Sequence, residues 1–398
     1  MKTKKKHNKK YVFHILYFCL FLYNTTECFT QNRLKIKNST NNDVKVKEFG
    51  LQLSKSFANG NDTVFLNALQ PKEFLKKIDL ENLENKNLTK FNVNFKLDYL
   101  EKIKSFPNEL INALKNGDFY NFVSYNFDPI DKTYHLIFRY YSESFGLDYH
   151  DYRLMTNGSE LIIDDIFIYT SCQKLSETLK LYYLSEVPKK NISSITTSSN
   201  YDFILMLKNY VDAKNSKQLE KAYKHISLLN KALKNKDRFT AMLKLELSSS
   251  ISEEAYFETM EDVLKYFKID PSINLTALRY HYLNKDYDAV FKSINNIENH
   301  THDTFLDFEK GNLSYAAKNY ESAIMFYKNM IENYPFFHLP KFSLLVIYEK
   351  NKEFKKATEL LNVIIKTSSY SKRTIIKKVK EQLPLISNSS EFKNWRKK

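Results

Sequence analysis

The chain has 398 residues, of which 43 % are apolar and 27 % are charged, and it contains six glycines and three cysteines. This length and apolar fraction exclude a disordered chain and leave room for two or three folded domains. So few glycines favour helices, and they exclude most glycine-rich phosphate-binding loops. Two of the three cysteines, Cys19 and Cys28, lie within the first 30 residues, so no disulfide framework is possible if those residues are removed.

The formal net charge is +15, but six lysines lie within the first ten residues, and without residues 1–30 the charge is +10. A basic excess favours anionic partners in general. No stripe of Arg and Lys interleaved with aromatic residues is present, so we expect solvated helix faces and no specific nucleic-acid partner.

Residues 1–30 have the pattern of a secretory signal peptide. A lysine-rich start to Lys10 precedes an apolar run from Tyr11 to Tyr23 of about 13 residues, against roughly 20 for a membrane span. We therefore expect cleavage near Thr30 and a secreted or periplasmic protein. The alternative is an uncleaved leader that anchors the N-terminus, and only then is a membrane partner expected.

A polar linker at residues 31–43 leads to a first domain at residues 44–187. Apolar residues at helical spacing predict three short helices before residue 84 and a further helix that contains Leu97, Leu100 and Ile103. Pro107 is expected to open another helix, because proline is tolerated in the first helical turn.

The apolar period then changes to two, which predicts strands at residues 119–127, 134–141, 149–155 and 161–169. Asn157 and Gly158 are a strong hairpin signal between the last two strands. Short connections predict an antiparallel sheet of about four strands, with the preceding helices on one face. This order resembles the NTF2-like or cystatin-like α+β cone over about residues 45–185.

A Ser/Thr-rich linker at residues 188–200 precedes a second, all-α domain at residues 201–398. Its first helices are expected at residues 201–213, 216–234, 237–248, 252–267 and 272–283, and a capping helix at residues 371–383. The predicted fold class is therefore an α+β domain followed by an all-α helical solenoid.

Apolar and small residues recur after 34 residues in this second domain: Tyr320, Ala323 and Tyr327 are matched by Phe354, Ala357 and Leu361. With Gly311 and Pro335, this pattern resembles the tetratricopeptide repeat family over roughly residues 272–367.

In that family the first helix of each repeat lines a groove that holds a partner peptide. The register of Gly311 then places in the groove Phe308, Asn312 and Tyr315, with Phe342 and Glu349 in the next repeat. Asn312 falls where a carboxylate-binding groove carries asparagine, whereas Phe308 replaces its lysine. The alternative is that these residues fill the interior of the superhelix.

No catalytic spacing is present, so we expect no catalytic residue, cofactor or metal. Cys172 is expected to be a small packed hydrophobe, and residues 300–303 a polar turn with a helix cap. A pocket could instead form on the sheet from Asp148, His150, Asp151, Asp164 and Asp165. Strand alternation lets only about half of them face one way, and a solvated outer face is the alternative.

Two functions remain open at this stage. The first is an exported, non-enzymatic interaction or scaffold protein of the bacterial cell envelope, which binds a protein or peptide through the helical groove. The second is a small-ligand binder, hydrolase or isomerase that uses His150 with an aspartate, the repeats being an oligomerisation arm. The sequence leaves the oligomeric state undetermined.

Overall fold

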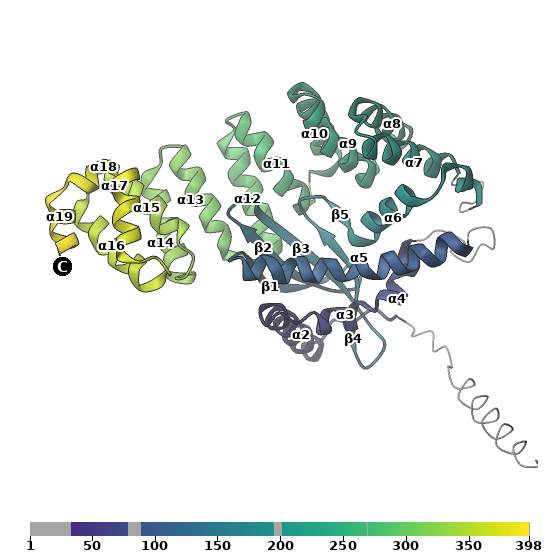
Figure 1. Cartoon of the computed structure of the whole chain (residues 1–398), viewed down its shortest axis with the longest axis horizontal. Helices are drawn as coiled ribbons and strands as arrows, with labels where there is room; N and C mark the ends of the chain where they lie inside the picture. Colours follow the sequence, from purple (N-terminus) through teal and green to yellow (C-terminus); the bar gives the residue numbers. More distant parts are fainter. Residues whose placement is uncertain (1–32, 79–88, 195–200, 269, 398) are drawn as a thin grey trace, which may run out of the picture.

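The computed structural model describes residues 33–78, 89–194, 201–268 and 270–397. The predicted leader lies outside these residues. A β-sheet occupies the centre of the molecule, the helices that precede it cover one of its faces, and a long helical array runs past the other (Figure 1).

The chain begins with the three short helices that were predicted, α2 (Thr40–Ala58), α3 (Thr63–Leu69) and α4 (Pro71–Phe74), followed by a 3-10 turn at Leu75–Ile78. The side chain of Ser39 accepts a hydrogen bond from the Asn42 amide and caps the start of α2.

The next helix, α5 (Thr89–Lys115), is a single helix with Pro107 inside it, so the predicted new helix at this proline was wrong. The apolar residues Ile103, Leu110 and Ile111 on both sides of the proline are buried in the same core. This shared packing outweighs the roughly 3 kcal/mol that an interior proline costs.

The sheet is an antiparallel meander with the strand order β1-β2-β3-β4-β5. The four predicted strands are β1 (Phe119–Asp128), β2 (Thr133–Ser142), β3 (Gly146–Thr156) and β4 (Leu161–Ile168). β5 (Gln173–Lys174) was not predicted, because two residues show no period. It leads into α6 (Leu175–Glu186).

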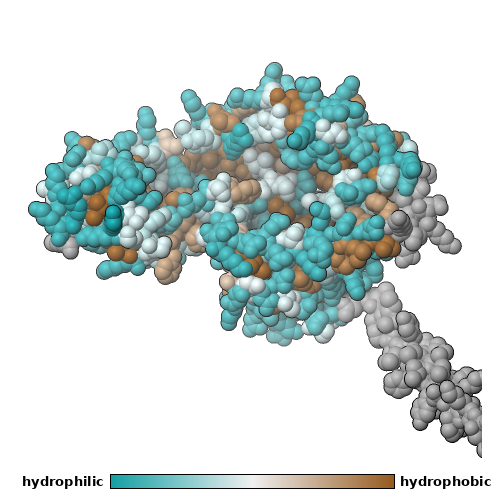
Figure 2. Space-filling model, in the orientation of Figure 1, coloured by the Kyte–Doolittle hydropathy of each residue, from teal (hydrophilic) through white to brown (hydrophobic). Residues whose placement is uncertain are grey.

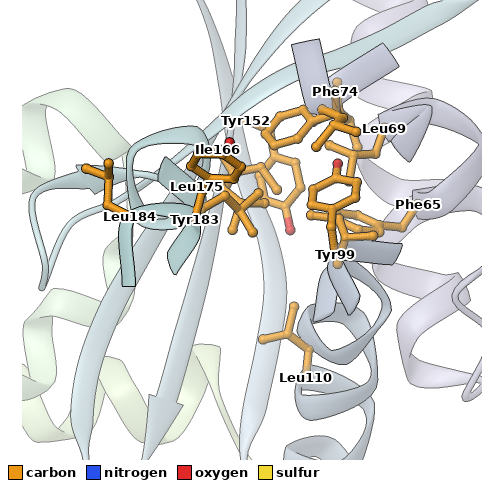
Figure 3. Packing of buried hydrophobic residues seen from close by; sticks show 14 of the residues in the cluster. Phe65, Leu69, Phe74, Tyr99, Leu110, Tyr152, Ile166, Leu175, Tyr183 and Leu184 are labelled. Carbon is orange, nitrogen blue, oxygen red and sulfur yellow. The ribbon is translucent and has the colours of Figure 1, made fainter. Parts of the chain in front are cut away.

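One face of the sheet packs against the N-terminal helices and α6. Its buried side chains, which include Tyr152 and Ile166, meet Phe65, Leu69 and Tyr99 from α3 and α5 (Figure 3). A Cβ atom on Gly50 would lie 2.5 Å from the ring of Phe122, so this glycine lets α2 lie close to β1.

After a 3-10 turn at Lys189–Ser194, the rest of the described chain is helical, as predicted. None of its helices, nor any other in the described residues, is long and apolar enough to cross a membrane. The array consists of α7 (Tyr201–Asn215), α8 (Leu219–Ala232), α9 (Arg238–Ile251), α10 (Glu253–Phe267), α11 (Pro271–Leu283), α12 (Tyr287–Thr301), η4 (Thr304–Leu306), α13 (Asp307–Ala316), α14 (Tyr320–Asn333), α15 (Leu339–Lys350), α16 (Phe354–Thr367), α17 (Lys372–Gln382), α18 (Pro384–Asn388) and α19 (Ser390–Lys397).

The second face of the sheet is covered by the array. Ile137, Tyr149 and Tyr169 from the sheet share a buried apolar cluster with Ile294 and Ile297 of α12. The sheet is therefore buried on both sides, and the expectation of a solvated or open outer face was wrong.

Helices α13 and α14 approach closely at Gly311. A Cβ atom at this position would lie 2.6 Å from the ring of Tyr327, which is 2 % exposed. Ala323 is also buried in the core of this region. The small residues allow the two helices of the pair to pack against each other.

We predict that Gly311→Val lowers the free energy of unfolding by about 1–3 kcal/mol, because the added methyl groups overpack the Tyr327 site. Urea unfolding followed by circular dichroism measures this loss. In a Tyr327→Leu background the same substitution should cost less, since the ring that it strikes is gone. An equal cost in both backgrounds would contradict the assigned contact.

Candidate functional site

A buried ion pair joins the sheet to the array. The Arg139 guanidinium on β2 donates to Asp303 Oδ1 at 2.5 Å, and the Tyr149 hydroxyl donates to Asp303 Oδ2 at 2.8 Å. Arg139 is 4 % exposed and Asp303 is 1 % exposed. Asp303 also accepts from the Phe305 amide, and so caps η4.

A cavity of about 570 Å³ opens beside this ion pair, between β1 and the loops that flank α13 and α14. Its size is typical of ligand pockets. We call it the aromatic hollow, and its main lining residues are Phe119, Arg139, Asp303, Phe305, Tyr334, Phe336 and Phe337.

The floor and the rim of the aromatic hollow differ in exposure. Phe305 and Phe337 are 1 % and 2 % exposed, and their ring centroids lie 4.8 Å apart. Phe336, in contrast, is 78 % exposed. Together with the aromatic lining of the cavity, this exposed ring makes the aromatic hollow the candidate interaction site.

Arg139 also gives the aromatic hollow a polar group. Its guanidinium lies over the Phe305 ring, 4.1 Å from the centroid. Its Nε atom is buried and has no hydrogen-bond partner among the described residues. Asp303 already balances the charge of Arg139, so the guanidinium is a fixed polar group of the lining and not a free charge.

A second cavity, of about 270 Å³, lies farther along the same junction. We call it the polar hollow, because its lining includes His135, Asp151, Arg153, Asp165, Lys174, Arg238, Asp270 and His300. His135 Nδ1 and Asp151 Oδ1 are hydrogen-bonded at 2.7 Å. Burial alone would lower the pKa of His135, but Asp151 and Asp131 outweigh it, and the pKa is raised. Burial lowers the pKa of His300.

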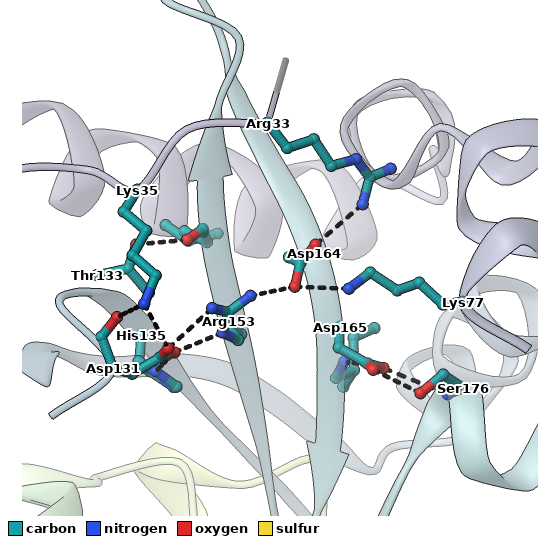
Figure 4. Close-up of polar contacts among 12 residues, drawn as sticks. Arg33, Lys35, Lys77, Asp131, Thr133, His135, Arg153, Asp164, Asp165 and Ser176 are labelled. Carbon is teal, nitrogen blue, oxygen red and sulfur yellow. Dashed lines mark hydrogen bonds and ion pairs between the residues drawn. The ribbon is translucent and has the colours of Figure 1, made fainter. Parts of the chain in front are cut away.

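Most charges at the polar hollow are bound to one another rather than free for a ligand. Arg153 donates two hydrogen bonds to Asp131, at 2.5 and 2.8 Å, and a third to Asp164 (Figure 4). Asp164 also pairs with Arg33 at 3.1 Å and with Lys77 at 2.7 Å. This network holds residues from the predicted linker against the sheet.

The predicted set on β3 and β4 does not form one pocket. His150 lies on the opposite face, where its Nδ1 meets the Tyr120 hydroxyl at 3.0 Å and its ring packs on Phe106. Asp148 accepts from Thr170.

Of the remaining predicted residues, Asp164 belongs to the ion network described above. Asp165 accepts from Ser176 at 2.6 Å. Of the residues predicted for the pocket, Asp151 and Asp165 line the polar hollow. The histidine next to Asp151 is His135 and not His150.

The five predicted groove residues all contact other residues of the protein. Phe308 and Glu349 are buried, whereas Asn312, Tyr315 and Phe342 are half-buried. Phe308 packs on Tyr141 and Phe337, and Tyr315 packs on Tyr320. Phe342 packs on His338 and Tyr370. The Asn312 carbonyl accepts from the Tyr327 hydroxyl, and Glu349 accepts from the amides of Leu385 and Ile386.

Cys172 is fully buried, and burial raises the pKa of its thiol to about 11. It is therefore a packed thiol, as expected, and not an activated nucleophile. In the 300–303 segment Asp303 points to Arg139, whereas His302 is exposed in a left-handed conformation. Within the described ranges no group of three His, Cys, Asp or Glu residues is arranged to hold a metal ion.

Sequence reasoning missed the residues of the aromatic hollow. The signal was present in β2, where Leu136, Ile137 and Phe138 form a continuous apolar run that is typical of a strand buried on both faces. Phe336 and Phe337 directly follow Pro335, which was interpreted only as part of the repeat pattern.

A scan of the sequence against models of known protein families finds no match, and a search of curated proteins finds no similar sequence. The candidate site therefore has to be argued from its own geometry.

We predict that Asp303→Ala lowers the free energy of unfolding by about 3–5 kcal/mol, because it leaves the buried Arg139 charge unpaired. Chemical unfolding measures this effect. The double variant Arg139→Met/Asp303→Leu should be more stable than Asp303→Ala, since it removes both charges. Glu73→Ala, which breaks the exposed pair with Lys76, is the control and should cost less than about 1 kcal/mol. If Asp303→Ala lowered the free energy of unfolding as little as the control does, a structural role of the Arg139–Asp303 pair would be contradicted.

The raised pKa of His135 predicts a pH-dependent contribution to stability. The contribution is fully present below the unfolded-state pKa of about 6.5 and is lost as the pH rises through the folded-state pKa. The stability difference between the wild type and His135→Gln should therefore be larger at about pH 5.5 than at about pH 8.5. Thermal unfolding at both pH values measures this difference. The contribution of His300 cancels, because this residue is present in both proteins. A difference that does not change with pH would contradict the pairing with Asp151.

Proposed function

We propose that the protein is a non-enzymatic binding scaffold that holds a segment of a partner protein in the aromatic hollow. An apolar side chain of the partner enters between Phe305, Tyr334 and Phe336, next to the Arg139 guanidinium. The observation that carries the proposal is the highly exposed Phe336 at the rim of a cavity that is lined largely by aromatic rings.

The composition of the hollow supports a protein partner. Aromatic residues and arginine are enriched in protein interfaces and dominate their binding energy. Phe119, Phe337 and Tyr334 supply rigid rings. Arg139 supplies a polar group that needs no further ordering, because Asp303 and the ring of Phe305 already hold its guanidinium. A preorganised site of this kind loses little entropy when it binds.

The proposal includes export and a tetratricopeptide-like array. Export is supported by the lysine-rich start and the apolar run at residues 11–23. The array is supported by the 34-residue recurrence and by the close contact of Gly311 with Tyr327. The binding surface differs from the groove that the resemblance implies, because the groove residues are already packed.

A random-peptide display on the full chain tests this function. We expect the enriched peptides to carry an aromatic or large aliphatic residue that fits the hollow. Isothermal titration should show that Phe336→Ala weakens their binding at least about tenfold, which corresponds to about 1.4 kcal/mol.

Phe145→Ala is the matched control, because Phe145 is also a highly exposed phenylalanine, 59 % exposed, but does not line the hollow. It should bind the same peptides as the wild type. No enrichment, or peptides that bind the wild type and Phe336→Ala equally, would reject the proposal.

A further inference from the structure

Outside the leader, the positive charge of the chain is concentrated at its C-terminal end. Residues 350–398 contain 14 Lys and Arg against four Asp and Glu. Residues 31–349, in contrast, contain 41 of each sign and are neutral overall. The charge that remains after removal of the leader therefore belongs to the last 49 residues.

These residues form the far end of the helical array, which the last helices α16 to α19 close (Figure 1). Apolar residues such as Ile375, Val379 and Trp395 are buried inwards, and the surface at this end is largely hydrophilic in the view of Figure 2. The cations face solvent: the exposed ones on α17 and α19 are Arg373, Lys377, Lys380, Lys393, Arg396 and Lys397.

Few of these cations are neutralised inside the protein. In the described part of residues 350–397, two lysines pair with carboxylates, Lys356 with Glu353 at 3.0 Å and Lys377 with Glu381 at 3.9 Å. An array needs a polar surface at its end, but it does not need charge of one sign. An excess of one sign gives this end of the array an electrostatic field that attracts anionic partners.

We propose that this end of the array docks on an anionic lipid bilayer surface. Lysine outnumbers arginine 12 to two in residues 350–398. Lysine is a compact point charge that suits a diffuse negative surface, whereas paired recognition of nucleic-acid phosphates favours arginine.

The aromatic and apolar residues at this end also favour a bilayer. Phe392 and Trp395 stack on each other and are 1 % and 8 % exposed, so they offer no platform for nucleic-acid bases. Leu385 on α18 is 51 % exposed among the basic helices. An exposed apolar side chain on a basic surface is typical of a surface that contacts lipid headgroups.

The test is co-sedimentation of the full chain with vesicles of phosphatidylcholine, with and without phosphatidylglycerol. Each lysine near an anionic surface strengthens binding by about fivefold. We therefore expect binding to increase with phosphatidylglycerol and to weaken at high salt, because salt screens exposed charges. The lysine-rich leader also favours anionic vesicles, but all variants carry residues 1–30, so its contribution cancels when their affinities are compared.

The variant Arg373→Gln/Lys377→Gln/Lys380→Gln should bind the anionic vesicles at least about tenfold more weakly than the wild type. The matched control is Lys45→Gln/Lys47→Gln/Lys55→Gln, which removes three exposed lysines from α2, away from the end of the array. The control should bind as the wild type does. Circular dichroism should show that both variants are folded.

Three results would overturn the proposal. The first is equal binding to vesicles with and without phosphatidylglycerol. The second is an equal loss in the α17 variant and in the α2 control. The third is tighter binding to duplex DNA than to the anionic vesicles, which would assign this end to nucleic acid instead.

Discussion

A sheet with two apolar faces has to be covered on both, and this requirement organises the molecule. In β2, Leu136 and Phe138 face the N-terminal helices, whereas Ile137 and Tyr141 face the array. At about 25 cal/mol per Å² of buried apolar area, covering the second face is a large term in the stability of the fold. The helical array is therefore part of the core around the sheet and not a separate arm.

Apolar packing is not directional, so it does not by itself fix where the array lies along the sheet. The position of the array is fixed by directional hydrogen bonds from Arg139 and Tyr149 to Asp303. These bonds form only when the three side chains face one another. A slide of α12 past β2 would leave a charge buried without a partner, which is strongly destabilising. We infer that this polar contact sets the register of the junction, while the surrounding aliphatic and aromatic residues supply most of its stability.

This arrangement explains why the candidate sites lie at the margins of the junction. The inner surface of the array covers the sheet, and Phe308 packs on Tyr141 of β2 there. What remains free is the aromatic hollow at the edge of the sheet and the basic end of the array beyond it. The two proposed surfaces are compatible, since one would hold a protein segment while the other rests on a membrane.

The sequence by itself determined the local elements, because periodicity acts over neighbouring residues. Spacing alone predicts the four long strands and the helices of the array. It also predicts that two helices approach each other closely at Gly311. Alternation also implies that His150 and Asp151 point in opposite directions. It does not say which face each one enters, or what covers that face.

Only the tertiary structure decided those questions, because they depend on contacts between residues far apart in the chain. Asp303 is 164 residues from Arg139, and no local pattern links the two. The same holds for Pro107, which stays inside α5 because both halves of that helix pack on one core. The sequence determined which residues are apolar and how they repeat, and long-range packing decided which of them became interior and which were left to bind.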